Sequence, residues 1–378
     1  MVKAWDYALI GDIFEFKNGL NKGKEFFGYG TPIVNYTDVY KKRALTKTDI
    51  NGKVSLEADE IKRFEARQND VFFTRTSETP EEVGMSSVLL EDVEGCVFSG
   101  FVLRARPKNN MLNPQYCKYC FSTPEIRSAI ILGCTYTTRA LTNGKQLSAI
   151  SIPVPPLEEQ KRIAEALSDV DSLISSLEKL ITKKKAVKQG AMQELLTGKK
   201  RLPGFEGAWR KCKLKDVLTV GHGQSQHAIE DVNGKYPILA TGGIIGRTNS
   251  FLYDQPSVLI GRKGTIDKPQ YMETPFWTID TLFYTKIGTD YHAKYIFYVF
   301  CLIDWLDYNE ASGVPSLSAS VIENIDVIIP ALREQAAIAS ILSDMDNEIE
   351  TLEQKLKKAR QIKQGMMQQL LTGKIRLV

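Results

Sequence analysis

Two stretches of the sequence hold side chains that could bind a metal ion or cleave a phosphodiester. Asp12, Glu15 and Lys17 form a carboxylate–lysine set like that of nucleases, but the matching stretch in the second half, DVLTVG, keeps only the aspartate. We interpret this set as a solvated strand edge. Cys117 and Cys120 have no second cysteine pair and no histidine near them, and three histidines in the whole chain cannot build a usual zinc site alone. We interpret the two cysteines as core thiols and expect no metal site.

A third stretch, Asn113-Pro114-Gln115-Tyr116, is close to the Asn/Asp-Pro-Pro-Tyr signature of amino-methyltransferases. The alternative is the start of a helix, with Asn113 as the N-cap and Pro114 in the first turn. We favour the helix start, because the second half has TDYHAKY at this place and no glycine-rich cofactor loop follows a strand elsewhere. The sequence therefore predicts no catalytic residue and favours a protein that reads another molecule.

Composition sets the class of protein. The chain has 378 residues, enough for two to three domains, with 43% hydrophobic and 25% charged residues, as in a soluble globular protein. No apolar run reaches the roughly 18 residues of a membrane span, and the N-terminal stretch has acidic residues and no signal-peptide core. We expect a cytoplasmic protein with reduced cysteines. The net charge of +4 permits binding to nucleic acid without requiring it.

A repeat organises the elements that must position any functional side chain. KQGAMQELLTGKKRL at 188–202 and KQGMMQQLLTGKIRL at 363–377 share twelve of fifteen residues, and the match extends over 153–202 and 328–377. The beginnings of the two halves, 4–19 and 208–223, also match. Between these anchors the halves differ strongly. The order is therefore variable domain, fixed segment, variable domain, fixed segment.

The fixed segments have the pattern of long helices. Apolar residues step by four and three along both copies, which is a heptad seam and predicts helix packed on helix. The seam residues are Ile163, Leu167, Val170, Ile174, Leu177, Ile338, Leu342, Met345, Ile349 and Leu352. Each helix of about forty residues would be roughly 60 Å long, and we expect the two to pair antiparallel in a pseudo-two-fold molecule. Gly190 and Gly365 lie inside these helices at a cost of about 1 kcal/mol each, which suggests close packing on the other helix or on a docked subunit.

The variable halves have the pattern of α+β domains. Short apolar runs separated by glycine-rich and polar turns, such as DVFFTR and SVLIGRKG, predict β-strands. NPQYCKYCFSTPEIRSAI and YHAKYIFYVFCLIDWL predict one or two packed helices in each half.

The duplicated phrase IPVPPLEEQKRIAEAL, followed by QELLTGKKRLPGF, resembles the specificity subunits of type I restriction–modification enzymes. SGVPSLSASVIENIDVIIP in the second half fits the same family, so the resemblance covers the whole chain. It implies two target recognition domains, each reading one half of a split, asymmetric double-stranded DNA site, on spacer helices that dock two modification subunits. The implied division is 1–155 and 203–330 for the recognition domains, and 156–202 and 331–378 for the spacer helices. S-adenosylmethionine, Mg²⁺ and ATP are then expected on the modification and restriction subunits only.

Base edges and phosphates are read by Arg, Lys, Asn, Gln, Ser and Thr side chains, which the loops of both halves supply. TRTSET (74–79) and GRKGT (261–265) occupy matching places after an apolar strand, and CTYTTRALTNGK (134–145) and ASGVPSLSAS (311–320) each precede the duplicated helix. GHGQSQH (221–227) adds two glutamines. The predicted DNA-binding residues are Arg75, Thr76, Ser77, Tyr136, Thr137, Arg139, Lys145, Gln224, Gln226, Arg262, Lys263, Ser316 and Ser318.

Two other functions remain open on the sequence alone. A protein-binding scaffold would show no salt-sensitive binding to duplex DNA, and a self-contained methyltransferase or nuclease would bind cofactor on this chain. The DNA sequence read and the length of the unread gap do not follow from these patterns.

Overall fold

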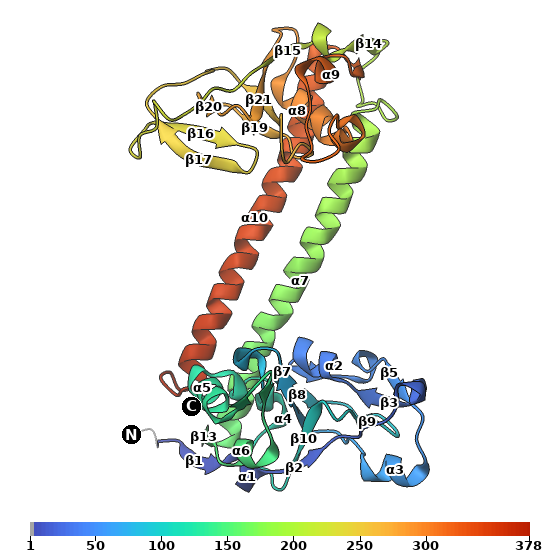
Figure 1. Cartoon of the computed structure of the whole chain (residues 1–378), viewed down its shortest axis with the longest axis vertical. Helices are drawn as coiled ribbons and strands as arrows, with labels where there is room; N and C mark the ends of the chain where they lie inside the picture. Colours follow the sequence, from blue (N-terminus) through green and yellow to red (C-terminus); the bar gives the residue numbers. More distant parts are fainter. Residues whose placement is uncertain (1–3) are drawn as a thin grey trace. The chain divides into compact units, whose positions relative to one another are not determined.

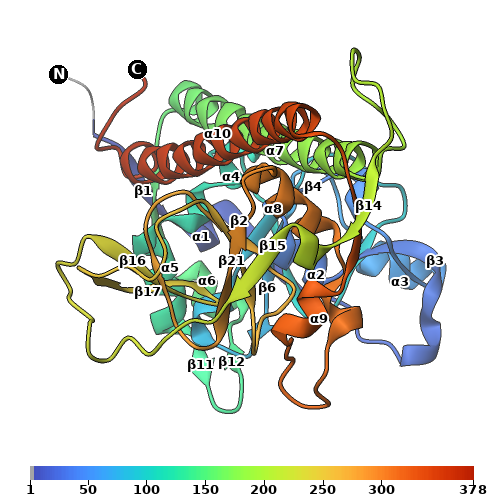
Figure 2. The ribbon, with the colours of Figure 1, turned by 90° about the horizontal axis from the view of Figure 1, so that it is seen from above.

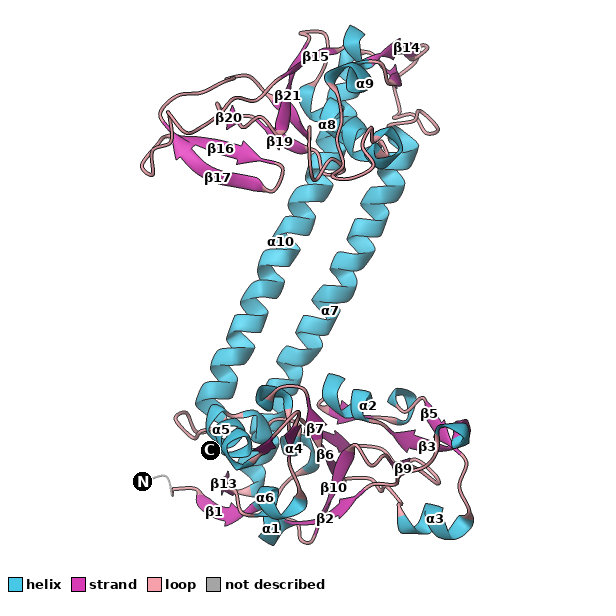
Figure 3. Cartoon of the chain, viewed as in Figure 1, coloured by secondary structure: helices cyan, strands magenta, loops and turns pink. Residues whose placement is uncertain are grey.

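A computed structural model describes residues 4–378 of the chain. The chain forms two units, one from residues up to Ser176 with Lys355–Val378 and one from Leu177–Gln354. Each unit therefore combines a variable half with segments of both duplicated helices (Figure 1). Strands and helices are mixed in both units, which confirms the predicted α+β class (Figure 3).

The first unit contains thirteen strands and six short α-helices within its described residues, besides its parts of the long helices. The strands are β1 (Asp6–Leu9), β2 (Phe14–Asn18), β3 (Phe27–Val34), β4 (Ala44–Leu45), β5 (Gly52–Val54), β6 (Val71–Thr74), β7 (Thr76–Ser77), β8 (Ser86–Leu89), β9 (Val97–Phe98), β10 (Val102–Pro107), β11 (Thr135–Tyr136), β12 (Ala140–Leu141) and β13 (Ser151–Val154). The helices are α1 (Ile10–Ile13), α2 (Tyr36–Lys41), α3 (Ala58–Arg63), α4 (Pro114–Cys117), α5 (Pro124–Gly133) and α6 (Gly144–Ser148).

The central sheet of the first unit has the order β2-β10-β6-β8-β4, and all its pairs are antiparallel except β4 with β8. Successive residues of a strand point to opposite faces. Val71 and Phe73 pack with α4 and α5 in the main core, whereas Phe72 belongs to a second core on the other face. Burial on both faces explains why this strand is a continuous apolar run and does not alternate.

The second unit repeats this plan with fewer elements. Its strands are β14 (Arg210–Lys213), β15 (Leu218–Gly221), β16 (Tyr236–Ala240), β17 (Gly243–Thr248), β18 (Ser257–Gly261), β19 (Gln270–Met272), β20 (Trp277–Thr278), β21 (Leu282–Ile287) and β22 (Asp326–Ile329), and its short helices are α8 (Ala293–Leu302) and α9 (Ala319–Glu323). The main sheet has the order β15-β21-β18-β19, and β18 is buried along its whole length.

Two helices of 39 residues, α7 (Leu157–Leu195) and α10 (Leu332–Leu370), correspond to the duplicated segments. Within each unit a part of α7 lies beside a part of α10 (Figures 1 and 2). In the first unit Lys363 pairs with Asp171, and in the second Lys188 pairs with Asp346. Lys184 pairs with Glu348, so the ion pairs of the second unit step upward along one helix and downward along the other. Arg376 and Arg201, which follow the ends of the two helices, pair with Glu159 and Glu334 at the helix starts. The predicted antiparallel pairing is confirmed within each unit.

The heptad seam is buried unevenly. The first seam residues of each helix, Ile163 with Leu167 and Ile338 with Leu342, are buried in the main core of their unit, and so pack on strands and helices of the variable half as well. The remaining seam residues are either buried or half-buried: Val170, Ile174, Leu177, Met345, Ile349 and Leu352. The seam therefore joins each helix both to its partner helix and to the variable half of its unit.

The start of each long helix is fixed by a buried carboxylate and a buried amide. Glu159 accepts hydrogen bonds from Trp5 Nε1 at 3.0 Å and Arg376 at 2.7 Å. Its counterpart Glu334 accepts the same bonds from Trp209 and Arg201 in the second unit. Both glutamates stand at the positive end of a helix dipole, where a negative charge is favoured. They are only 3% and 2% exposed, so their main role is to form the internal ion pairs.

The adjacent glutamines repeat a second set of bonds. Gln160 accepts from the Asn113 backbone at 2.7 Å and donates to the Pro155 carbonyl at 2.8 Å. Gln335 makes the corresponding bonds, at 2.9 Å each, with His292 and Pro330. The duplicated Glu-Gln residues thus have the same role in both units: their hydrogen bonds join the variable half to the first turn of its helix.

The two helix glycines do not contact the partner helix. A Cβ atom built on Gly190 or Gly365 meets no other atom within 4 Å, apart from the backbone of its own helix turn and chain neighbours. The explanation that these glycines allow close packing on the other long helix is therefore wrong.

Candidate nucleic-acid interface

In the first unit, the two loops predicted to read bases lie against one another. Strand β7 follows Arg75 and pairs antiparallel with β12, so that Ser77 faces Ala140 and Thr76 faces Leu141. β12 in turn pairs with β11, which makes the 134–145 loop a hairpin seated on the 74–79 loop. The Thr142 backbone N–H donates to the Arg75 carbonyl at 3.0 Å and completes the joint. The backbone of both loops is therefore fixed by strand pairing.

These loops border a hollow of about 420 Å³ that is lined by Thr76, Ser77 and Arg139 together with residues of α2 and the β9–β10 turn. Its other lining residues are Tyr36, Tyr40, Glu78, Glu82 and Phe101. The hollow thus combines a cation and hydroxyls with carboxylates and aromatic rings, which are the groups that meet hydrogen-bonding edges and flat faces of bases.

Glu82 is held in this hollow by two hydroxyl groups. Tyr40 donates to one carboxylate oxygen at 2.6 Å and Ser77 donates to the other at 3.2 Å. The hydrogen bond to Glu82 raises the pKa of Tyr40, so that the phenol stays protonated and keeps donating. Ser77 is only 5% exposed, and its role in the structure is to orient this carboxylate.

The other predicted residues of this unit, Arg75, Tyr136, Thr137 and Lys145, are not among the residues that line the hollow. Tyr136 is 56% exposed on β11, and the Thr137 backbone N–H donates to the Arg139 carbonyl in the turn of the hairpin. Arg75 is half-buried between the two loops. Lys145 is exposed on α6 and does not line the hollow.

In the second unit the matching loops also meet. Lys263 and Ser316 form an isolated antiparallel bridge, and the Leu317 backbone N–H donates to the Arg262 carbonyl at 2.9 Å. The four predicted residues Arg262, Lys263, Ser316 and Ser318 line one hollow of about 520 Å³. His222, Asp280 and Glu310 also line this hollow.

The remaining predicted residues of the second unit have local roles. Ser318 is the N-cap of α9 and accepts a hydrogen bond from the Val321 backbone at 3.3 Å. Gln224 is exposed and its carbonyl accepts from Trp277 Nε1 at 2.9 Å, while Gln226 is half-buried. Neither glutamine lines the hollow, although His222 in the same stretch does.

Arg75 and Arg262 occupy equivalent positions, because each makes the same two contacts in its unit. The Arg75 backbone N–H donates to the Phe101 carbonyl at 2.9 Å, and its guanidinium donates to the Gly100 carbonyl at 3.5 Å. The Arg262 backbone N–H donates to the Thr281 carbonyl at 2.8 Å, and its guanidinium to the Asp280 carbonyl at 3.3 Å. We call these matching contacts of Arg75 and Arg262 the shared frame of the two units. The hollows beside this frame are lined by different side chains.

The stretches that resembled catalytic motifs have structural roles. Asn113 is the N-cap of α4 and accepts from the Gln115 backbone at 2.9 Å, while Tyr116 is fully buried, which confirms the helix start. Asp12 lies in α1, and Glu15 and Lys17 lie on β2, an edge strand of the central sheet. Cys117 and Cys120 are buried in the core, and burial raises the pKa of the Cys120 thiol.

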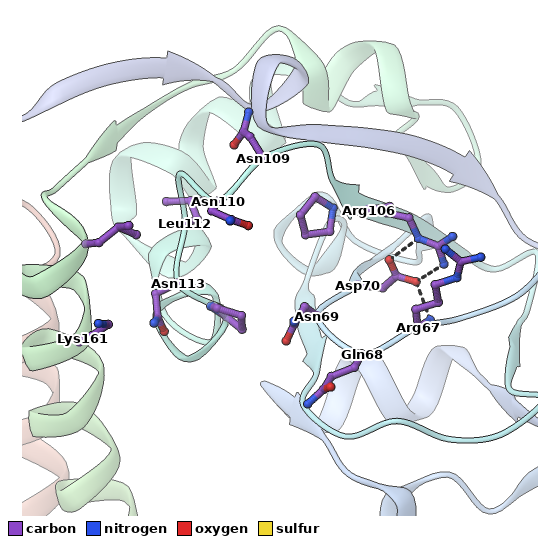
Figure 4. A pocket seen from close by; sticks show the side chains of 13 residues that line it. Arg67, Gln68, Asn69, Asp70, Arg106, Asn109, Asn110, Leu112, Asn113 and Lys161 are labelled. Atoms are coloured by element: carbon purple, nitrogen blue, oxygen red, sulfur yellow. Dashed lines mark hydrogen bonds and ion pairs between the residues drawn. The ribbon is translucent and has the colours of Figure 1, made fainter.

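A second hollow of about 410 Å³ in the first unit lies beside Asn113 (Figure 4). Its one buried acid, Asp70, accepts from Arg106 at 2.7 and 2.8 Å and from the Arg67 backbone at 2.8 Å. The other side chains labelled there are mainly amides, including Asn69, Asn110 and Asn113. With its carboxylate fully engaged, this hollow has no base positioned for proton transfer.

Searches over the described part of the chain bear on metals and membranes. Across residues 4–378, no three His, Cys, Asp or Glu side chains gather in a way that could hold a metal ion. No helix in that range is both long and apolar enough to cross a membrane.

Sequence reasoning missed the aromatic residues of the first hollow and the acidic residues of both. Tyr36 and Tyr40 stand four residues apart in a polar stretch, which is a detectable signal, and their rings stack at 5.7 Å between centroids. Phe101, Asp280 and Glu310 carry no signal in the sequence, because only the folded turns bring them beside Arg75 and Arg262.

Comparison with known proteins agrees with this geometry. The family described as "Type I restriction modification DNA specificity domain" matches residues 3–189 and 206–361. The type I restriction enzyme MjaVIII specificity subunit of Methanocaldococcus jannaschii is 26% identical over 335 residues, covering 74% of this chain and 75% of the relative. The EcoKI specificity subunit of Escherichia coli is 26% identical over 185 residues, covering 48% of this chain and 39% of the relative.

A solved structure shows the same fold at low identity. The type I restriction–modification S subunit from M. genitalium matches with a TM-score of 0.63 at 14% identity, covering 97% of this chain and 96% of that one. With the family match over both halves, the two joined recognition loops and the duplicated helices, the chain belongs to the DNA-specificity subunits of type I restriction–modification systems.

Proposed function

We propose that each unit reads one half of a bipartite, asymmetric double-stranded DNA site through its hollow. The observation that carries this proposal is the shared frame of Arg75 and Arg262, lined differently in the two units. In this proposal the shared contacts of the two arginines give the two units equivalent DNA-reading sites. The different side chains that line the two hollows give each unit a different preference for bases.

The chemistry of the linings suits direct readout in the major groove. Arginine pairs with guanine O6 and N7, carboxylates accept from the cytosine amino group, and serine and threonine bond to either. We assign Arg75 and Arg262 to base edges and Arg139 and Lys263 to phosphates or guanine. Further contacts in this proposal come from Thr76, Tyr136, Thr137, Ser316, Ser318, Gln224 and Gln226, with Lys145 as a more distant phosphate contact and Ser77 acting through Glu82.

The duplicated helices would dock two modification subunits, one on each unit. Gly365 is flanked on α10 by exposed Gln364 and Gln368, and the same face recurs on α7 as Gln189, Gly190 and Gln193. A glycine inside a helix costs about 1 kcal/mol relative to alanine, and here nothing in the chain fills the space beside it. Two matching Gln-Gly faces suit two copies of one partner that approaches the helix backbone closely.

The partners would supply the catalysis. In this proposal the modification subunits bind S-adenosylmethionine, restriction subunits join the complex and use Mg²⁺ and ATP, and the present chain binds DNA and sets the spacing. The long helices, at 1.5 Å per residue, would fix the number of unread base pairs between the half-sites.

The test is to express the chain with modification subunits and to sequence the methylated adenines in the host genome. We expect one bipartite motif with a constant gap. Exchanging residues 1–150 for the corresponding domain of a relative should change one half-site and leave the gap and the other half-site intact. A change in both half-sites after that single exchange would overturn the proposal.

A further inference from the structure

The β9–β10 turn of the first unit presents a large apolar side chain at the rim of the reading hollow. Phe101 is 58% exposed and lines the hollow together with Thr76 and Arg139. Its neighbours there are hydrogen-bonding groups and the stacked rings of Tyr36 and Tyr40. An exposed phenylalanine at the rim of the hollow offers an apolar face that can pack on an apolar group of bound DNA, such as a thymine methyl.

The turn that carries Phe101 is held rigidly. The Val102 backbone N–H donates to the Ser99 carbonyl at 3.0 Å, and the Phe101 N–H donates to Ser99 Oγ at 3.3 Å. A side chain at Gly100 would come within 2.1 Å of Asn21 Oδ1, so the turn is packed against the preceding loop. Arg75 also donates to the Phe101 carbonyl at 2.9 Å. The ring is therefore presented from a fixed backbone.

The equivalent position in the second unit is Thr281, because its carbonyl accepts from Arg262 as that of Phe101 accepts from Arg75. Thr281 lines the second hollow beside Asp280. The same frame thus carries an apolar ring in one unit and a hydroxyl with a neighbouring carboxylate in the other. This difference predicts different chemistry in the two half-sites.

We propose that Phe101 packs against the 5-methyl group of a thymine in the half-site read by the first unit, and so makes that half-site depend on thymine. The inference rests on the proposed function. The thymine methyl is the apolar group of the major groove, and phenylalanine is among the side chains that contact it.

The experiment uses the complex of the full chain with its modification subunits and the DNA motif obtained from genome sequencing. Each thymine of the first half-site is replaced singly by deoxyuridine, which removes only the methyl group. Burying one methyl group corresponds to about a four-fold gain in affinity, so the wild-type complex should bind one substituted duplex about four-fold more weakly. Phe101→Ala should bind the thymine duplex more weakly and should lose this sensitivity. Phe101→Leu should keep part of it.

Thr281→Ala is the matched control, because it changes the equivalent turn of the other unit. It should leave the deoxyuridine effect in the first half-site unchanged. Thermal unfolding and gel filtration of each variant with the modification subunits report folding and assembly.

Four outcomes overturn the inference while the proposed function stands. The first half-site could contain no thymine, every deoxyuridine duplex could bind like the parent, or Phe101→Ala could keep the full deoxyuridine effect. If Phe101→Ala binds DNA normally and fails to assemble, the ring belongs to a protein interface and the inference is wrong. The absence of any specific motif would instead refute the proposed function itself.

Discussion

Two tyrosines of α8 allow one chemical change to be made with opposite expected effects. Tyr295 and Tyr298 are both fully buried. The Tyr298 hydroxyl donates to the Asp346 carboxylate at 2.7 Å, whereas among residues 4–378 the Tyr295 hydroxyl has no hydrogen-bond partner. An unpaired buried hydroxyl costs about 1–3 kcal/mol, and a hydrogen bond to a charged group contributes about 1.5–3 kcal/mol.

Tyr295→Phe should therefore stabilise the second unit by about 1 kcal/mol, because it removes a desolvated group and keeps the ring. Tyr298→Phe should destabilise it by about 1.5 kcal/mol, near the lower limit, since Asp346 keeps its ion pair with Lys188. For a unit of this size, 1 kcal/mol corresponds to a change of about 2–4 °C in unfolding temperature.

The first unit supplies an internal repetition of this test. Tyr116 is buried with an unpaired hydroxyl like Tyr295, and Tyr119 donates to Asp171 at 2.8 Å like Tyr298. Differential scanning calorimetry of the four phenylalanine variants should show two small increases and two decreases in unfolding temperature. If both members of a pair shift in the same direction, the reasoning about their hydroxyl groups is refuted.

Three further predictions concern recognition, docking and pH. Arg75→Ala and Arg262→Ala should each weaken binding by about 1–3 kcal/mol at one guanine of a single half-site, as measured by competition with single-base variants; weakening at both half-sites by either change would contradict the assignment. Gly365→Ala should raise the stability of the first unit by about 1 kcal/mol and weaken binding of the modification subunit in titrations, whereas unchanged binding would remove the glycine from the docking face. The Arg376 guanidinium holds the pKa of Glu159 below its ordinary value of 4.5, so their ion pair stabilises the fold above that pH and loses this effect as the pH falls through the lowered pKa. Unfolding temperatures measured from about pH 6 to about pH 3 should fall less steeply for Glu159→Gln than for the parent chain, and equal slopes would argue against this linkage.

The long helices and the strands could be predicted because their signals are local. The duplicated sequence located α7 and α10 and its periodicity predicted them as helices, and a doubly buried strand such as β6 is a continuous apolar run. The burial of Glu159 could not be predicted, because its partner Arg376 is 217 residues away and a glutamate in the first turn has a simpler explanation in the helix dipole.

The reading loops were predicted from composition and position, and the structure brings the two loops of each unit together. Their individual residues were harder to assign. Ser77 has the right chemistry and is buried against Glu82, while Lys145 and the glutamines of 221–227 lie outside the hollows. Composition identifies a loop that can bond to bases, but strand pairing decides which of its side chains point into the hollow.

The sharing of each unit between two copies of one helix has a consequence for shorter chains. In the first unit Asp171 and Glu159 pair with Lys363 and Arg376, and the duplicate of that segment supplies Lys188 and Arg201 at the same spacing. A polypeptide of residues 1–202 therefore contains both the acidic and the basic partners of these ion pairs. Two copies of it could each donate the basic segment to the other and so form two identical units. Such a homodimer would have exact two-fold symmetry. Its two readers would be the same, so its preferred DNA would be a palindrome, and the asymmetry of the proposed target would be traced to the divergence of the second half alone.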